Sequence, residues 1–222
     1  MRKYLFGLCV CGLALAHKSI AQDTLRFDLK KCANEHRLEF FNRQLIPLAD
    51  QSRSAIGISD GKLEGGAWLK GVEFSDGTIE VDVRGKNVDQ RSFLGICFHG
   101  KDQDNFDAIY FRPFNFLTHD SVRFTHCIQY ISMPGYPWER LRKEFTGQYE
   151  SSIPQRPDPD SWIHLRIVLN YPDITVYVND YTEPTLKIHQ INDIRSGKIG
   201  LFVGDDSDGD FANLSLLKTH VP

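Results

Sequence analysis

Apolar and polar residues alternate with a period of two along many short segments of this chain. The clearest are 78–83 (TIEVDV), 162–169 (WIHLRIVL) and 174–178 (ITVYV). Such alternation is typical of strands that bury one face and expose the other. Turn-forming sequences such as Asp60-Gly61 and 170–173 (NYPD) separate the segments. The pattern therefore predicts an all-β protein, an antiparallel two-sheet β-sandwich.

The segment 92–116 predicts the central hairpin of this sandwich. An apolar run from Phe93 is interrupted by the polar turn 101–105, and apolar and polar residues then alternate. One face of the hairpin should belong to the core. The other face should carry Tyr110, Arg112 and His99, directed into an open trough.

Other segments complete the predicted elements. We expect a strand near the start of the mature chain and a loop over 30–50 with a short strand at 38–41. A further strand is expected at 123–132, although its sequence does not decide which side chains face the core. The spacing of Trp138, Leu141 and Phe145 predicts one short helix near 138–146.

The first residues have the pattern of a secretory signal peptide. Two basic residues precede an apolar run over 4–16, and Ser19-Ile20-Ala21 is a small-residue cleavage site. The run is too short to span a bilayer. We therefore expect cleavage after Ala21, a single domain over 22–222, and a secreted or periplasmic protein without a membrane span.

The net charge bears on the class of partner, and the cysteine spacing bears on disulfide formation. Residues 1–21 hold three basic residues and no acids, so their removal changes the formal net charge from −3 to about −6. This balance disfavours nucleic acid as a partner. The remaining cysteines, Cys32, Cys97 and Cys127, are widely spaced, which favours buried thiols. A Cys97–Cys127 disulfide is the alternative.

Four segments resemble the concanavalin A-like lectin/glucanase superfamily of jelly rolls, which includes laminin-G-like domains. They are 77–85 (GTIEVDVRG), 93–116, 161–180 and 197–216. The chain is most similar to bacterial secreted domains named after 3-keto-disaccharide hydrolases. The resemblance implies a jelly roll that binds ligands on its concave sheet. It does not imply one activity, because this fold carries enzymes, lectins and adhesion modules.

Several side chains near the hairpin are candidates for binding a sugar. Aromatic rings stack on the C–H faces of sugars, and planar polar groups hydrogen-bond to vicinal hydroxyls. The candidate ligand-binding residues are Tyr110, Arg112, Asn115, Gln129, Tyr130 and Trp138. The other interpretation of this cluster is a solvated stripe on the sheet.

Acidic residues suggest two further sites. Glu80 and Asp82 share a strand face, as the acids of family-sixteen glycoside hydrolases do, but no third acid follows, which favours a solvated face. Related jelly rolls often hold a structural Ca²⁺ with an Asp at the start of the last strand, which implies Asp210 here. A solvated acidic turn over 204–210 is the alternative.

These observations leave three functions open. The first is a carbohydrate-binding domain that carries out no reaction. The second, implied by the resemblance, is a glycoside-processing enzyme of the 3-keto-disaccharide hydrolase type, with His99 as general base and Arg112 stabilising the enolate. The third is a non-catalytic adhesion or assembly module.

Overall fold

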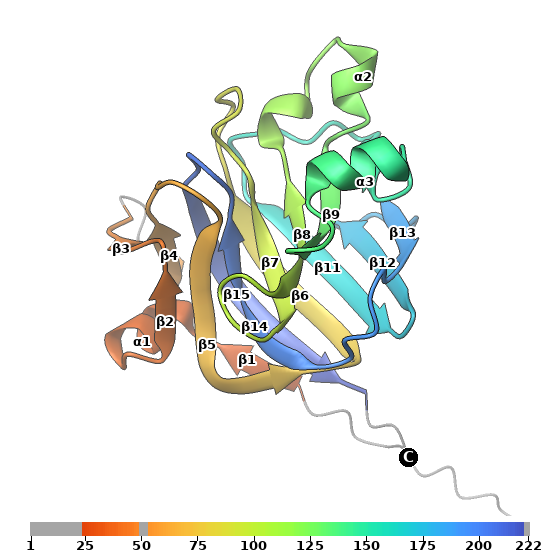
Figure 1. Cartoon of the computed structure of the whole chain (residues 1–222). Helices are drawn as coiled ribbons and strands as arrows, with labels where there is room; N and C mark the ends of the chain where they lie inside the picture. Colours follow the sequence, from red (N-terminus) through yellow and green to blue (C-terminus); the bar gives the residue numbers. More distant parts are fainter. Residues whose placement is uncertain (1–23, 49–52, 220–222) are drawn as a thin grey trace, which may run out of the picture.

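The alternating segments form the strands of two antiparallel sheets that pack face to face (Figure 1). The structure, a computed structural model, describes residues 24–48 and 53–219. The predicted signal peptide, residues 1–21, lies outside the described residues. Within them, the prediction of an all-β antiparallel sandwich is confirmed.

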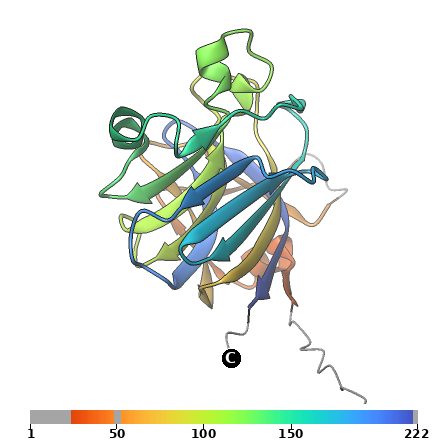
Figure 2. The same cartoon turned by 90° about the vertical axis from the view of Figure 1, so that its right-hand side faces the viewer.

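Sheet A has eight strands and sheet B has seven among the described residues. In spatial order, sheet A consists of β13 (Leu186–His189), β12 (Asp173–Val178), β11 (Ile163–Asn170), β6 (Gly77–Arg84), β15 (Gly209–Lys218), β4 (Ala55–Ile58) and β3 (Leu45–Ile46), and β1 (Thr24–Phe27) also pairs with β15. Sheet B consists of β10 (Glu150–Ser151), β9 (Ile128–Met133), β8 (Phe106–Phe111), β7 (Leu94–Gly100), β14 (Gly197–Val203), β5 (Gly65–Phe74) and β2 (Leu38–Phe41). Figure 2 shows β11, β12 and β13 of sheet A nearest the viewer.

The core lies between the sheets, and the strand registers align its side chains. Ile167 pairs with Ile79, and Leu165 pairs with Val81, so each pair points to the same side of sheet A. All four side chains are fully buried. Burial of an aliphatic side chain of this size contributes about 1.5–3 kcal/mol, so the alternating strands account for much of the driving force for folding.

Sheet B is buried on its outer face as well as its inner face. An aromatic layer covers the outer face, and the ring centroids of Phe41 and Trp68 lie 5.2 Å apart. Phe106 packs against both rings and against Phe202, whose ring is 5.4 Å from that of Tyr110. Every residue of β7 and β8 is consequently buried.

The short helices connect strands at the margins of the sandwich. The predicted helix is confirmed as α3 (Trp138–Glu144), which buries Leu141. The loop expected over 30–50 is wrong in part, because α1 (Leu29–Asn34) occupies its first residues. Asp28 caps α1 by accepting a hydrogen bond of 2.9 Å from the backbone N–H of Lys31. Six residues are too few to show a helical period in the sequence.

The strand predicted over 123–132 begins later than expected. A helical turn, α2 (Ser121–Phe124), precedes it, and β9 starts only at Ile128. Asp120 caps α2 through the backbone N–H groups of residues 122 and 123. A 3₁₀ helix, η1 (Pro113–Asn115), follows β8. None of the helices within 24–48 and 53–219 has the length and apolar character needed to cross a membrane.

The cysteines of the described chain are buried free thiols. Cys97 lies on the outer face of sheet B, and Cys127 lies just before β9. Burial raises the pKa of the Cys127 thiol to about 11. The preferred interpretation of isolated buried thiols is confirmed, and the alternative Cys97–Cys127 disulfide does not form.

His99 points into the sandwich, so its predicted place in an outer trough is wrong. The residue has a positive φ of 51°, and the pairing of β14 with β7 shifts register between residues 198 and 200. This irregularity interrupts the alternation of side chains along β7. The imidazole consequently lies on the inner face, with Nδ1 3.6 Å from Oδ2 of Asp107.

A buried polar cluster surrounds His99 at one margin of the core. The side-chain amide of Asn192 donates hydrogen bonds of 2.7 Å to Asp107 Oδ1 and to Ser132 Oγ. His99 Nδ1, Asp107 Oδ2 and the Tyr130 hydroxyl have no hydrogen-bond partner within the described parts of the chain. The amide of Asn192 thus anchors the connection between β13 and β14 to sheet B.

The outer face of sheet A is solvated, and its acidic residues are paired. Asp82 Oδ1 lies 2.8 Å from His164 Nδ1, and Asp82 Oδ2 lies 3.0 Å from the Arg53 guanidinium. The hydrogen bond to Asp82 raises the pKa of His164 despite partial burial. Burial alone would raise the pKa of Asp82, but hydrogen bonds from His164 and Asn213 outweigh it and lower that pKa. Asp82 therefore acts as a cross-strand ion-pair partner.

Removal of the Asn192 amide should destabilise the fold. We expect Asn192→Ala to lower the free energy of unfolding by about 3 kcal/mol, because Asp107 and Ser132 lose their donor in the interior. Urea denaturation measures this loss. The exposed Asn87 provides the control, and Asn87→Ala should change stability by no more than about 0.5 kcal/mol. Equal effects of the two variants would contradict the anchoring role.

Stability should depend on the Asp82–His164 pair in a pH-specific way. A raised His164 pKa contributes stability below its unfolded pKa of about 6.5, and this contribution is lost as pH rises through the folded pKa. The lowered Asp82 pKa contributes stability that is lost as pH falls. His164→Gln should therefore lower Tm most near about pH 5.5 and least near about pH 9. A deficit in Tm that is constant across this range would rule out the ion pair as its cause.

Candidate functional site

A cleft of about 650 Å³ opens at the end of sheet B where β8 ends and β7 and β9 begin. Helix α3 and the loops that precede β5 and follow β14 contribute residues to its lining. The lining residues are Leu63, Glu64, Gln90, Phe93, Arg112, Asn115, Arg123, His126, Trp138, Glu139, Arg142, Asp205 and Asp206. Distant segments of the chain therefore build one mixed aromatic and charged cleft.

Arg112 is the most enclosed charged side chain that lines this cleft, with 5% of its surface exposed. Its Nη2 donates a hydrogen bond of 2.9 Å to the Tyr110 hydroxyl. Its Nη1 donates to Oε1 of Gln129 at 3.3 Å and to the backbone carbonyl of His126 at 3.4 Å. Partners on two strands thus hold the guanidinium in a fixed plane.

Aromatic rings surround the same guanidinium. The Arg112 Cζ atom lies 5.2 Å from the Tyr110 ring centroid and 5.7 Å from those of Phe93 and Trp138. The Arg142 guanidinium lies 4.8 Å from the centroid of Trp138. Such cation–π contacts strengthen when water is excluded. Trp138 nevertheless keeps 37% of its residue surface exposed, so part of its side chain is accessible to a ligand.

Tyr110 does not face an open trough, which corrects the expectation for the hairpin. Only 3% of its surface is exposed, because the rings of Phe93 and Phe202 pack against it. Burial raises the pKa of Tyr110 to about 12, so its hydroxyl stays neutral and accepts the hydrogen bond from Arg112. Tyr110 therefore holds Arg112 from beneath and does not line the cleft itself.

Glu150 supplies the negative charge that this cationic region needs. Its pairing with Gln129 in β10–β9 brings it beneath the cleft, where its side chain is 4% exposed. Oε2 lies 2.8 Å from Nη2 of Arg142, 2.7 Å from Nδ1 of His126 and 4.0 Å from Nη1 of Arg112. A buried carboxylate is stable only with such partners, so these contacts also fix its neighbours.

His126 is a neutral imidazole at neutral pH. Burial lowers its pKa, and the charges of Arg142 and Arg112 lower it further, while Glu150 opposes the shift. Because Nδ1–H donates to Glu150, Nε2 carries the lone pair of the neutral ring. The hydrogen bonds found in the described chain leave Nε2 without a protein partner, so it can accept one from a bound molecule.

The structure gathers some of the predicted binding residues and separates others. Asn115 and Trp138 line the cleft together with Arg112, and Asn115 Nδ2 donates to the His126 carbonyl at 3.2 Å. Gln129 is buried beneath the cleft, whereas Tyr130 lies on the opposite, inner face of sheet B. The alternation along β9 that the sequence left undecided is thereby resolved.

Sequence reasoning missed His126, Arg142 and Glu150. His126 lies within the strand predicted over 123–132, whose facing side the sequence left undecided, so no local signal marked it. Arg142 lies one residue after the buried Leu141 of α3, in a turn whose orientation the helical spacing does not determine. Glu150 belongs to a two-residue strand, too short to show alternation.

Asp210 has no arrangement suited to calcium. Its Oδ2 accepts hydrogen bonds from Arg84 Nε at 2.9 Å and forms an ion pair with Arg84 Nη2 at 2.8 Å. A guanidinium at that position repels a cation, whereas calcium needs six to eight oxygen ligands. No group of three or more potential metal-ligating side chains occurs in the described portion of the chain. The donor set thus does not fit a structural Ca²⁺.

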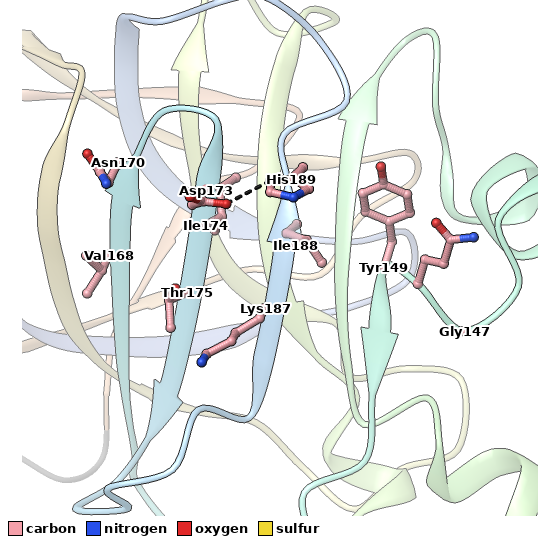
Figure 3. Close-up of a pocket in the computed structure, with 11 residues that line it drawn as sticks. Gly147, Tyr149, Val168, Asn170, Asp173, Ile174, Thr175, Lys187, Ile188 and His189 are labelled. Carbon is pink, nitrogen blue, oxygen red and sulfur yellow. Dashed lines mark ion pairs between the residues drawn. The ribbon is translucent and has the colours of Figure 1, made fainter.

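A second hollow, of about 860 Å³, lies over β11, β12, β13 and the segment 147–149 (Figure 3). Its ion pair joins Asp173 and His189 at 2.7 Å, and their side chains are 55% and 77% exposed. Exposed pairs of this kind contribute little to stability or binding. The Arg112 cleft, with its enclosed charges, is therefore the stronger candidate.

Comparisons with known proteins identify the fold. No protein-family model and no curated protein matches the chain. A carbohydrate-binding module from Bacillus subtilis, CBM66, superposes with a TM-score of 0.58 at 16% identity, covering 81% of this chain and 95% of the module.

Two other solved structures give the same result. A Bacillus subtilis protein of unknown function with a galectin-like fold has a TM-score of 0.58 at 12% identity, covering 87% of this chain and 94% of that one. The VIP36 exoplasmic/lumenal domain, in its Ca²⁺/Man3GlcNAc-bound form, has a TM-score of 0.56 at 17% identity, covering 84% and 85%. The chain therefore has a concanavalin A-like, galectin-like β-sandwich fold.

Proposed function

We propose that this protein binds a glycan in the Arg112 cleft. The observation that carries the proposal is the enclosed Arg112 guanidinium beside the partly exposed ring of Trp138. A sugar offers C–H faces for stacking on an aromatic ring and paired oxygen atoms for a guanidinium. Asn115 and His126 add polar groups at the same cleft.

The similarity to sugar-binding proteins supports this proposal. Two structures with the same sandwich fold are a carbohydrate-binding module and a domain bound to Man3GlcNAc. The predicted signal peptide would bring the mature protein to the periplasm or the cell exterior, where glycans are accessible. The proposed ligand is therefore an extracellular or periplasmic carbohydrate.

An enzyme with His99 as base has less support from the geometry. His99 is 3% exposed and lies between the sheets, so a sugar in the cleft does not reach it. A general base must lie within hydrogen-bond reach of the proton that it removes. Any reaction of the 3-keto-glycoside type in this cleft needs another base.

Substitutions at the cleft should weaken glycan binding. We expect Trp138→Ala to lower affinity about tenfold through loss of stacking. Arg112→Lys should lower it by about tenfold or more, because an ammonium cannot replace the planar donor pair. A glycan array first identifies a ligand, and calorimetric titration then measures the affinities.

The controls come from sheet A, where Arg166 lies over the Tyr177 ring at 4.1 Å. Arg166→Lys and Tyr177→Ala make the same kinds of change far from the cleft and should leave affinity unchanged. Binding that responds equally to both sets of substitutions, or no binding of any glycan by the unaltered protein, would reject the proposed site.

A further inference from the structure

The cleft contains a histidine whose imidazole is oriented by a buried carboxylate, as the imidazole of a general base often is. His126 Nδ1 lies 2.7 Å from Oε2 of Glu150, and Arg142 binds the same carboxylate oxygen at 2.8 Å. The buried carboxylate therefore fixes both the tautomer and the orientation of the ring. A carboxylate that binds one imidazole nitrogen and leaves the other for the substrate is a recurrent catalytic arrangement.

Burial, helped by the neighbouring guanidiniums, keeps His126 ready to accept a proton. Arg112 at the end of β8, Arg142 on α3 and Arg123 on α2 share the cleft with it, and Glu150 on β10 lies beneath it. Burial and the neighbouring guanidiniums lower the His126 pKa. The ring is therefore unprotonated at neutral pH, as a base requires.

Arg112 retains hydrogen-bond donors for an anionic group. Nη1 is used by Gln129 and a carbonyl oxygen, and one hydrogen of Nη2 is used by Tyr110. Nη2 keeps a second hydrogen, and Nε–H has no hydrogen-bond partner among residues 24–48 and 53–219. Nε and Nη2 are adjacent donors of the guanidinium. Such a pair matches the two oxygens of a carboxylate.

The acidic residues that line the cleft are partly engaged elsewhere. Asp205 accepts a hydrogen bond of 2.7 Å from the backbone N–H of Leu63, and Asp206 pairs with Lys62 at 2.7 Å. Glu64 and Glu139 complete the acidic lining. Asp89 pairs with Arg123, and among the described residues the carboxylate that pairs with Arg112 is Glu150, at 4.0 Å. The Arg112 guanidinium therefore remains able to bind an anion.

From these contacts we propose that the cleft cleaves a glycan containing 4-linked uronic acid by β-elimination, with Arg112 binding the carboxylate and His126 as the base. This inference rests on the proposed glycan-binding function and assigns a substrate class and a reaction to the same cleft. Glu150 is a positioning residue for His126.

The reaction balances without any co-reactant. His126 Nε2 takes the proton from C5, the carbon next to the carboxylate. The electron pair of that C–H bond forms the C4=C5 double bond, and the C4–O4 bond breaks. The imidazolium returns the proton to the departing O4. The products are a 4,5-unsaturated uronate and a glycan with a new hydroxyl group.

The substrate class follows from the C–H acidity that the substrate must have for a single imidazole to remove its proton. A C–H bond beside ordinary sugar hydroxyls is far too weak an acid for imidazole, whereas a carboxylate paired with Arg112 stabilises the charge that develops at C5. Elimination also needs no pair of carboxyls flanking the glycosidic bond, unlike glycoside hydrolysis by the two-carboxylate route. Glu150, the enclosed carboxylate beneath the cleft, already binds His126 and Arg142.

The test uses the full mature chain with polygalacturonate, alginate and hyaluronan, and with carboxyl-reduced polygalacturonate as the matched neutral polymer. Ultraviolet absorbance of the unsaturated uronate reports turnover, and calorimetry reports binding separately. We expect turnover and tighter binding with at least one polyuronate and neither with the reduced polymer. His126→Ala should lower turnover by about 100-fold or more while the affinity stays within about threefold.

Further variants keep the result interpretable. His126→Gln repeats the test with a side chain closer in size, and thermal denaturation confirms that each variant is folded. Glu150→Gln should lower kcat with little change in KM and should shift the acid limb of the pH profile. His189→Ala, at an exposed histidine of sheet A, should leave turnover unchanged.

The outcomes separate this inference from the function on which it rests. Polyuronate binding without absorbance change, or undiminished turnover in folded His126 variants, overturns the elimination reaction and leaves glycan binding standing. Equal binding of the carboxyl-reduced polymer overturns recognition of the carboxylate by Arg112. Absence of binding to every glycan tested overturns both proposals.

Discussion

The candidate site depends on the burial of sheet B on both of its faces. Sheet A covers the inner face, and the aromatic layer that includes Trp68, Phe106 and Phe202 covers the outer one. A polar group at the end of such a sheet has little water to solvate it and must find protein partners. The hydrogen bonds of Arg112 to Tyr110 and Gln129 are a direct consequence of this burial.

The same lack of water gives Glu150 its importance. One carboxylate serves Arg142 and His126 directly and lies 4.0 Å from Arg112, so the positions of three basic groups depend on one acidic side chain. A buried pair of this kind need not add stability, but it holds its members in a defined geometry. Defined geometry is what recognition of a ligand by planar donors requires.

The two outer faces of the sandwich therefore differ in the roles open to them. The outer face of sheet A is wet, and its charged groups, such as Asp82 and His164, pair across strands. The Asp82 and His164 side chains are 14% and 36% exposed, and solvent weakens ion pairs of this kind. Sheet B excludes water near its end and there combines an aromatic ring, Trp138, with enclosed charges. The candidate site accordingly lies on sheet B.

The sequence by itself determined the class of fold and the strands with one wet face, because their side-chain alternation is a local property of each segment. It also singled out Arg112 and Trp138, both of which line the cleft. Only the tertiary structure decided that a register shift turns His99 into the core and that Glu150 meets His126. These contacts join segments distant in the chain, and pairing between distant strands leaves no periodic trace in the sequence of either one.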